Sequence, residues 1–315
     1  GEPVTGDARF VEDYQLVTQK NKDTQILPTF NIAWDATDDL VIRGAIAKVM
    51  SRPDYSDLGA QQRITFVSDE WADDRAAFNE QPGFSGSGGN KNLKPFESVQ
   101  ADLSIEYYYS EGSAVGLALF HKKVDNFVVP LVIDAEQSFA GKNNIVDAGT
   151  INIAPYSTVG NGTDAVSKGA EIFIQHAFDN GFGFYANYTY NKTNKADVTV
   201  NGEEFGQSAL IGSAKYQYNT SVYYEGDAFN IRASYNKRGE TVLGLNSGLN
   251  VYQDPYEQVD VNASVNLYEG LSLTAAVINL TKSESVTRLG DDTDARLLNS
   301  SYSGRRYYAG FNYSF

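Results

Sequence analysis

Apolar and polar residues alternate one by one along most of this chain, and this pattern constrains the fold more than any other feature. Between residues 182 and 191, Phe182, Phe184 and Tyr188 share one side of a strand, whereas Asn187 and Thr189 share the other. The same division recurs over 99–107, 229–238 and 259–267. A period of two predicts β-strands with one apolar and one polar face, and helical periodicity is hard to find. The chain is therefore predicted to be all-β.

The connections between the predicted strands alternate strictly between short and long. Short turns rich in Gly, Asp and Asn are expected at 37–39, 111–112, 179–181, 225–227 and 269–270. Long polar loops are expected at 51–97, 125–165, 195–210, 239–254 and 282–302. This rhythm is typical of an outer-membrane β-barrel, with short periplasmic turns and long extracellular loops. A soluble sandwich would more often mix its loop lengths.

The pattern predicts about 11 antiparallel strands, an odd number. They are expected near 26–35, 40–50, 98–109, 113–124, 166–178, 182–194, 212–224, 228–238, 256–268, 271–281 and 303–315. With an odd number, the first and last strands run parallel and cannot close the barrel in the usual bacterial way. We therefore expect residues 26–315 to be the C-terminal part of a transmembrane antiparallel β-barrel, and residues 1–25 to be the end of an extracellular loop.

Composition excludes several classes of function. The 315 residues carry a formal charge of −15, which argues against nucleic-acid binding, because that binding depends on concentrated Lys and Arg. There is no cysteine and there are only two histidines, so thiol chemistry and multi-histidine metal sites are not expected. No apolar run approaches 18 residues, which excludes a transmembrane helix.

The polar faces of the predicted strands carry charged residues that we expect to line the barrel lumen. A charge at mid-membrane on the lipid side would cost about 2–4 kcal/mol, so these faces are assigned to the interior. The lumen-facing residues are predicted to be Arg43, Asp102, Glu106, Glu171, Arg232, Arg238 and Asp260. Lys48 shares a face with apolar residues, but it lies at a strand end, where a lysine can extend toward water.

Several segments resemble a known family. The terminal strand, from Tyr307 to Phe315, resembles the C-terminal strand by which outer-membrane proteins are recognised during assembly. The segments 27–34, 37–43 and 51–55 are similar to the middle of the barrel of TonB-dependent receptors. The segments 92–97, 120–127 (with Asp125-Asn126-Phe127) and 278–281 (Ile-Asn-Leu-Thr) also resemble this family.

The resemblance implies a 22-stranded barrel of the bacterial outer membrane, of which these strands would be the last 11. An N-terminal plug and the first half of the barrel would lie outside this sequence, and the plug would carry the contact with the TonB complex. The expected partners are this complex, the other half of the barrel, outer-membrane lipid and lipopolysaccharide, and an extracellular solute. The motifs look most like the branch of Caulobacter-like and Xanthomonas-like bacteria, which is often linked to carbohydrate uptake.

No catalytic constellation is predicted, and the chain is not expected to be an enzyme. His121 and His176 fall on the apolar sides of their strands, where an interfacial role is expected rather than that of a general base. The acidic residues of 69–74 and 291–294 could hold calcium, but a solvated loop is the preferred interpretation. No cofactor is expected, and the Gly- and Ser-rich stretch 83–90 is predicted to be a flexible loop.

For solute capture we expect loop aromatics that could stack on sugar rings, namely Tyr55, Trp71 and Phe84. The predicted function is active uptake of an extracellular solute, with an oligosaccharide as the candidate. The alternatives are a ferric-siderophore receptor and a structural or adhesive barrel that transports nothing.

Overall fold

The computed structural model describes residues 22, 24–59, 62–66, 84–139, 149–268, 270–290 and 295–313. These residues contain 21 strands, arranged in two sheets, and no helix. Accordingly, this part of the chain has no helix long and apolar enough to cross a membrane. The expectation of an all-β fold is confirmed.

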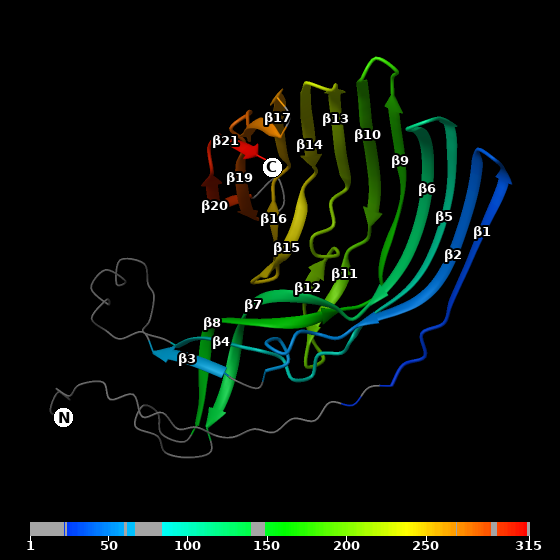
Figure 1. Ribbon diagram of the computed structural model, residues 1–315. Helices are drawn as coiled ribbons and strands as arrows, with labels where there is room; N and C mark the ends of the chain where they lie inside the picture. Colours follow the sequence, from blue (N-terminus) through cyan, green and yellow to red (C-terminus); the bar gives the residue numbers. More distant parts are fainter. Residues whose placement is uncertain are drawn as a thin grey trace.

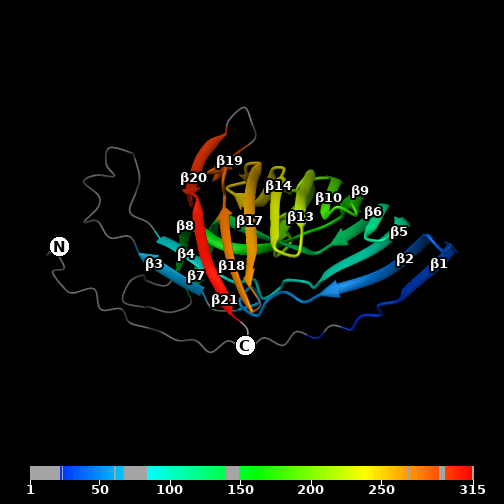
Figure 2. The same cartoon turned by 45° about the horizontal axis from the view of Figure 1, so that its top comes forward.

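Eleven strands form one antiparallel sheet, which we call the main sheet. In order across the sheet they are β1 (Thr29–Thr37), β2 (Leu40–Ser51), β5 (Phe96–Ser110), β6 (Ser113–Asp125), β9 (Ala165–Ala177), β10 (Phe182–Thr193), β13 (Tyr216–Glu225), β14 (Phe229–Arg238), β17 (Tyr256–Tyr268), β18 (Leu271–Ile278) and β21 (Arg306–Tyr313). Each strand overlaps one of the 11 predicted from the alternation. The sheet is curved and open, with β1 and β21 as its two edges (Figures 1 and 2).

The other ten strands form a second sheet, the loop sheet, inside the connections that were predicted to be long loops. They are β3 (Gln62–Phe66), β4 (Phe84–Gly88), β7 (Phe127–Phe139), β8 (Gly149–Gly162), β11 (Ala196–Val200), β12 (Glu203–Ser208), β15 (Thr241–Asn246), β16 (Leu249–Gln253), β19 (Glu284–Leu289) and β20 (Arg296–Tyr302). Figure 1 shows this sheet at the end of the main sheet opposite the short turns.

The stretch 83–90 corrects one expectation, because Phe84–Gly88 is strand β4 and not a flexible loop. Strand β4 pairs with β3 and also runs parallel to β8. A Cβ on Gly86 would lie 2.9 Å from the Arg63 carbonyl oxygen and 3.1 Å from Ile153. The glycine therefore permits close packing between two neighbours.

The apolar face of the main sheet is not covered by the second sheet. Phe30, Trp34 and Phe311 are 66%, 61% and 77% exposed on this face. The largest buried cluster instead lies where the loop sheet meets the main sheet, and includes Val124 and Phe127. An exposed apolar face on a large open sheet is the surface that a transmembrane barrel turns toward lipid.

Aromatic side chains form two groups on the apolar face. One group lies beside the short turns, where His176 stacks against Tyr109 and Phe182 contacts Tyr224. The other lies toward the loop sheet, where the rings of Tyr188 and Tyr218 are 4.8 Å apart. Two aromatic belts on one sheet face are typical of strands that cross a bilayer.

Candidate functional site

The strand register places all seven charged residues predicted for the lumen on one face of the main sheet, which we call the polar face. Residues directly opposite each other on neighbouring strands share a face, as do residues two apart along a strand. The register connects Arg43 to Ser104 on β5, Ser104 to Ala118, and Ala118 to Glu171. It continues through Thr189 and Gln217 to the remaining strands. The face includes Arg43, Asp102, Glu106, Glu171, Arg232, Arg238 and Asp260.

Near the short turns, charged residues of the polar face pair with one another. Arg43 forms an ion pair of 2.5 Å with Glu106, whose carboxylate also accepts a 2.7 Å hydrogen bond from Tyr108. Arg232 lies over the Tyr223 ring, with its guanidinium carbon 5.1 Å from the ring centroid, and is 3.4 Å from Glu225. The charges and hydrogen-bonding groups of these residues are therefore paired within the sheet.

An amide ladder crosses the middle of the polar face. Asn219 donates a 2.8 Å hydrogen bond to Asn187, and the amide of Asn187 lies 3.4 Å from Glu171. These side chains come from β9, β10 and β13, and the register places them side by side. The ladder offers amide groups and a carboxylate to water or to a polar solute.

A hollow of about 390 Å³ lies on the polar face at its loop-sheet end. Strands β13, β14 and β17 contribute Gln217, Asn236 and Tyr256, and the β19–β20 region contributes Ser285 and Ser301. Its lining is dominated by amides and hydroxyls. Such groups can donate and accept hydrogen bonds, so the hollow is suited to an oxygen-rich solute.

Arg238 and Lys237 are the cations in the lining of this hollow, and Lys237 already pairs with Glu257. A terminal nitrogen of Arg238 donates to Gln253, which in turn donates a 2.7 Å hydrogen bond to Ser285. The Nε of Arg238 is buried and has no hydrogen-bond partner in the described part of the chain. An unpartnered buried donor is costly to the folded state. Sequence patterns identified Arg238 but missed Gln253 and Ser285, because those residues lie in connections that were expected to be loops.

Asp260, in contrast, has a structural role. Its carboxylate accepts hydrogen bonds of 2.8 and 2.9 Å from the Gln258 side chain and one of 2.9 Å from the Asn279 backbone N–H. It therefore holds the end of β18 against β17.

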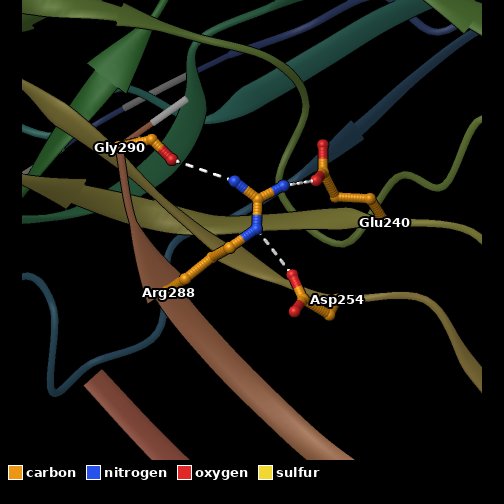
Figure 3. A network of polar contacts seen from close by, with 4 residues as sticks. All are labelled: Glu240, Asp254, Arg288 and Gly290. Carbon is orange, nitrogen blue, oxygen red and sulfur yellow. Dashed lines mark hydrogen bonds and ion pairs between the residues drawn. The ribbon is translucent and has the colours of Figure 1, made fainter. Parts of the chain in front are cut away.

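Arg288 is a second feature that alternation could not find, because its partners lie far away in the sequence. Its Nε donates a 2.6 Å hydrogen bond to Asp254, one terminal nitrogen donates to the Gly290 carbonyl oxygen at 3.1 Å, and the other pairs with Glu240 (Figure 3). The guanidinium carbon also lies 5.1 Å from the Tyr252 ring centroid. Arg288 thereby joins three segments of the loop sheet beside the hollow.

The predicted loop aromatics have different environments. Tyr55 is 93% exposed in a turn between β2 and β3. Phe84 begins β4 and packs against a buried cluster containing Ile153 and Tyr156. Trp71 lies outside the described residues, as do the acidic segments 69–74 and 291–294. The structure does not bring Tyr55 or Phe84 into the lining of the hollow.

Among the described residues outside the main sheet, two ionisable groups have shifted pKa values. Burial raises the pKa of the Asp57 carboxyl, and the neighbouring charge of Asp54 raises it further. Burial also raises the pKa of the Tyr156 hydroxyl, although a hydrogen bond with Gln62 opposes this shift. In both cases burial disfavours the charged form of the group.

The two histidines lie on the apolar face. His176 contacts Tyr109 and Phe178, and His121 shares its face with Leu119. Within the described ranges, no group of three or more His, Cys, Asp or Glu residues is arranged to hold a metal ion.

The chain is similar to known proteins over most of its length. The family model for the TonB-dependent receptor-like β-barrel matches residues 4–280. An iron-regulated outer membrane virulence protein of Vibrio cholerae serotype O1 is 25% identical over 231 residues, which cover 72% of this chain and 32% of that protein.

Solved structures share the fold. A mutant of the ferric enterobactin receptor PfeA from Pseudomonas aeruginosa superposes with a TM-score of 0.61 and 20% identity, covering 92% of this chain and 40% of that one. The siderophore receptor PirA from Acinetobacter baumannii gives a TM-score of 0.58 and 18% identity, with 92% and 41% covered. The chain therefore spans about a third of the curated relative and about two fifths of each receptor structure.

Proposed function

This chain belongs to the TonB-dependent receptor-like β-barrel family of the bacterial outer membrane, and from that membership we propose that it serves active solute uptake. In this proposal the apolar face of the main sheet meets lipid and the polar face lines the lumen. Residues 26–315 supply barrel wall, and residues 1–25 end an extracellular loop. Coupling to the TonB complex is made by a plug that lies outside this sequence.

The hollow on the polar face is the observation that carries the proposal. It lies where the main sheet meets the loop sheet, so a solute arriving from outside the cell would meet it on entering the lumen. Its amides and hydroxyls, with Arg238, suit a solute with many oxygen atoms. Binding there would hold the solute before it passes into the barrel.

An anionic ferric chelate is the solute class that we favour. Arg238 lines the hollow, and its guanidinium would form a charge-assisted hydrogen bond with an anionic oxygen. The relatives support the same class, because their names refer to iron regulation and to siderophores.

An oligosaccharide is the second candidate, supported by the hydroxyl-rich lining and by the exposed ring of Tyr55. Phe84 supports it less, because its ring packs against the Ile153 cluster. Trp71 and Tyr55 remain proposed contacts for this solute.

Binding and uptake by the whole receptor would test these proposals. We would measure the affinity of the purified protein for ferric enterobactin and for a neutral malto-oligosaccharide, and then uptake of each in cells with and without TonB. The variant Arg238→Gln should weaken binding of the ferric chelate by roughly tenfold or more, because it removes a charged hydrogen bond. Arg296→Gln, on exposed β20, is the matched control. Binding of the oligosaccharide alone would replace the first candidate with the second, and binding without TonB-dependent uptake would contradict transport.

A further inference from the structure

A row of basic side chains crosses the apolar face of the main sheet near the loop-sheet ends of β6, β9 and β10. His121 is the register partner of Lys168, and Lys168 is the partner of Lys192. All three side chains are exposed. They share this face with Leu119 and Ile172, so the row continues the surface that meets lipid.

The row lies at the level where the strands leave the bilayer. Lys168 and Lys192 each lie about ten residues from the short-turn ends of their strands, and a tilted transmembrane strand needs about 9–11 residues to cross. Tyr190, two residues before Lys192, belongs to the aromatic belt on the loop-sheet side. The row is therefore just beyond that belt, at the head groups of the outer leaflet.

Lys168 and Lys192 differ from three other lysines of this face, which form ion pairs. Lys48 pairs with Glu97 at 2.9 Å, and Lys123 and Lys237 pair with acidic side chains at 3.1 Å. Within the part of the chain that the structure describes, no ion pair reaches Lys168 or Lys192. Like charges directly opposite each other on neighbouring strands destabilise a sheet unless an anion lies between them.

We propose that His121, Lys168 and Lys192 form a binding site for the phosphate groups of a phosphorylated lipid in the outer leaflet. Opposite residues on neighbouring strands have Cβ atoms about 4.5–5.5 Å apart, so two ammonium groups can reach the oxygens of one phosphate. The phosphate neutralises the two lysines, and the acyl chains lie along Leu119 and Ile172. This inference depends on the outer-membrane location and not on which solute the receptor takes up.

Native mass spectrometry of the whole receptor in detergent would test the site. We would titrate bisphosphorylated lipid A, with phosphatidylethanolamine as a zwitterionic comparison and inorganic phosphate as a competitor. The double variant Lys168→Gln/Lys192→Gln should retain lipid A roughly thirtyfold more weakly than the wild type. The matched control is Lys122→Gln/Lys215→Gln, which removes two charges at a similar height on the polar face.

Lys168→Arg/Lys192→Arg keeps the charges and should bind as the wild type does. Heat-modifiable migration in electrophoresis would establish that each variant is folded. Equal retention of lipid A by the wild type and the glutamine variant would overturn the site. Displacement of lipid A by millimolar inorganic phosphate would overturn the assignment to lipid, and equal retention of phosphatidylethanolamine would overturn the role of phosphate charge. Because solute uptake is not measured, these outcomes are independent of the proposed transport function.

Discussion

The backbone N–H of Asn279 donates a 2.9 Å hydrogen bond to the Asp260 carboxylate, which fixes the end of β18 against β17. Asn279 is fully buried and has a positive φ of 58°. Its side chain accepts a 2.8 Å hydrogen bond from the Ser283 N–H and donates to the carbonyl oxygens of Ser283 and Gly304, each at 3.2 Å. One side chain thus closes the turn that leads into β19. Asparagine suits this position because its amide both accepts and donates these hydrogen bonds.

Replacing this side chain should destabilise the barrel wall. Asn279→Ala leaves the partly buried Ser283 N–H without its acceptor and puts alanine in a left-handed conformation that asparagine tolerates better. We expect a loss of about 2–4 kcal/mol, measured as a lower midpoint of thermal unfolding by circular dichroism. Thr281→Ala removes only a hydroxyl at an exposed position, with contacts of 3.4 Å to Asn279 and 2.9 Å to Ser283, and should have a smaller effect. Equal midpoints for Asn279→Ala and the wild type would contradict this role.

Gly162 and Phe127 form a second close relationship, at the junction of the two sheets. A Cβ on Gly162 would lie 2.1 Å from the Phe127 ring, and that ring is 3% exposed in the largest buried cluster. Gly162→Ala should therefore cost about 1–3 kcal/mol through overcrowding. Phe127→Leu frees space, so the double variant should lose less than the two single variants added together. If the stability losses of the two single variants add up in the double variant, the contact between Gly162 and Phe127 does not restrict the size of residue 162.

The main sheet could be predicted from the sequence because its determinants are local. In each strand the alternation separates apolar from polar side chains, and adjacent strands are joined by short turns or long excursions. Gly112 and Gly181 have positive φ angles of 66° and 84° in two of the predicted turns, a conformation that glycine adopts readily. All 11 strands could therefore be located to within a few residues.

The loop sheet could not be predicted in the same way, because much of its pairing is non-local. Strand β15 runs parallel to β7, and β4 runs parallel to β8, although long segments separate each pair in the sequence. Strands of five or six residues, such as β11 and β15, also carry too short an alternation to be distinguished from a polar loop. The alternation of residues predicted that Arg238 lies on the polar face. Gln253 and Ser285 come to lie beside it only through the non-local pairing of the loop sheet, so the sequence did not indicate them.

The turn that contains Asp57 should respond to pH. Burial and the nearby Asp54 raise the pKa of the Asp57 carboxyl above its ordinary value of 3.8, so the folded turn holds this proton more tightly than the unfolded chain does. The resulting stabilisation is fully present below the ordinary pKa and is lost as the pH rises through the raised value. Asp57→Asn removes the cost of the buried charge and should stabilise the turn at pH 7 but not at pH 3.5.

Hydrogen exchange at Asn90 would measure this effect, because the Asn90 N–H donates to the Asp57 carbonyl oxygen at 2.6 Å. Taking the ratio of variant to wild type at each pH cancels the intrinsic pH dependence of exchange. Asp38→Asn, in an exposed short turn, should give a ratio near one at both pH values. A ratio for Asp57→Asn that does not change with pH would contradict the shifted pKa.

Arg288 should control how firmly the loop sheet is held beside the hollow. Its guanidinium joins Asp254, Glu240 and the Gly290 carbonyl oxygen, and its side chain is only 14% exposed (Figure 3). Arg288→Ala leaves two carboxylates close together without the cation between them, so their repulsion should loosen the strands that carry them. We expect the backbone N–H groups of Asp254 and Gly290, which donate to Val286 and Asn250, to exchange roughly tenfold faster or more.

Exchange in β5 and β6 should stay unchanged in Arg288→Ala, because the main sheet has its own ladder of hydrogen bonds. Arg288→Lys keeps one charge but loses the planar fork that reaches several acceptors at once, and should give an intermediate rate. Arg296→Ala, an exposed arginine on β20, is the control for removal of a positive charge. Unchanged protection of Asp254 and Gly290 in Arg288→Ala would mean that strand pairing alone holds this region. The ion pairs would then serve only to neutralise charge beside the hollow.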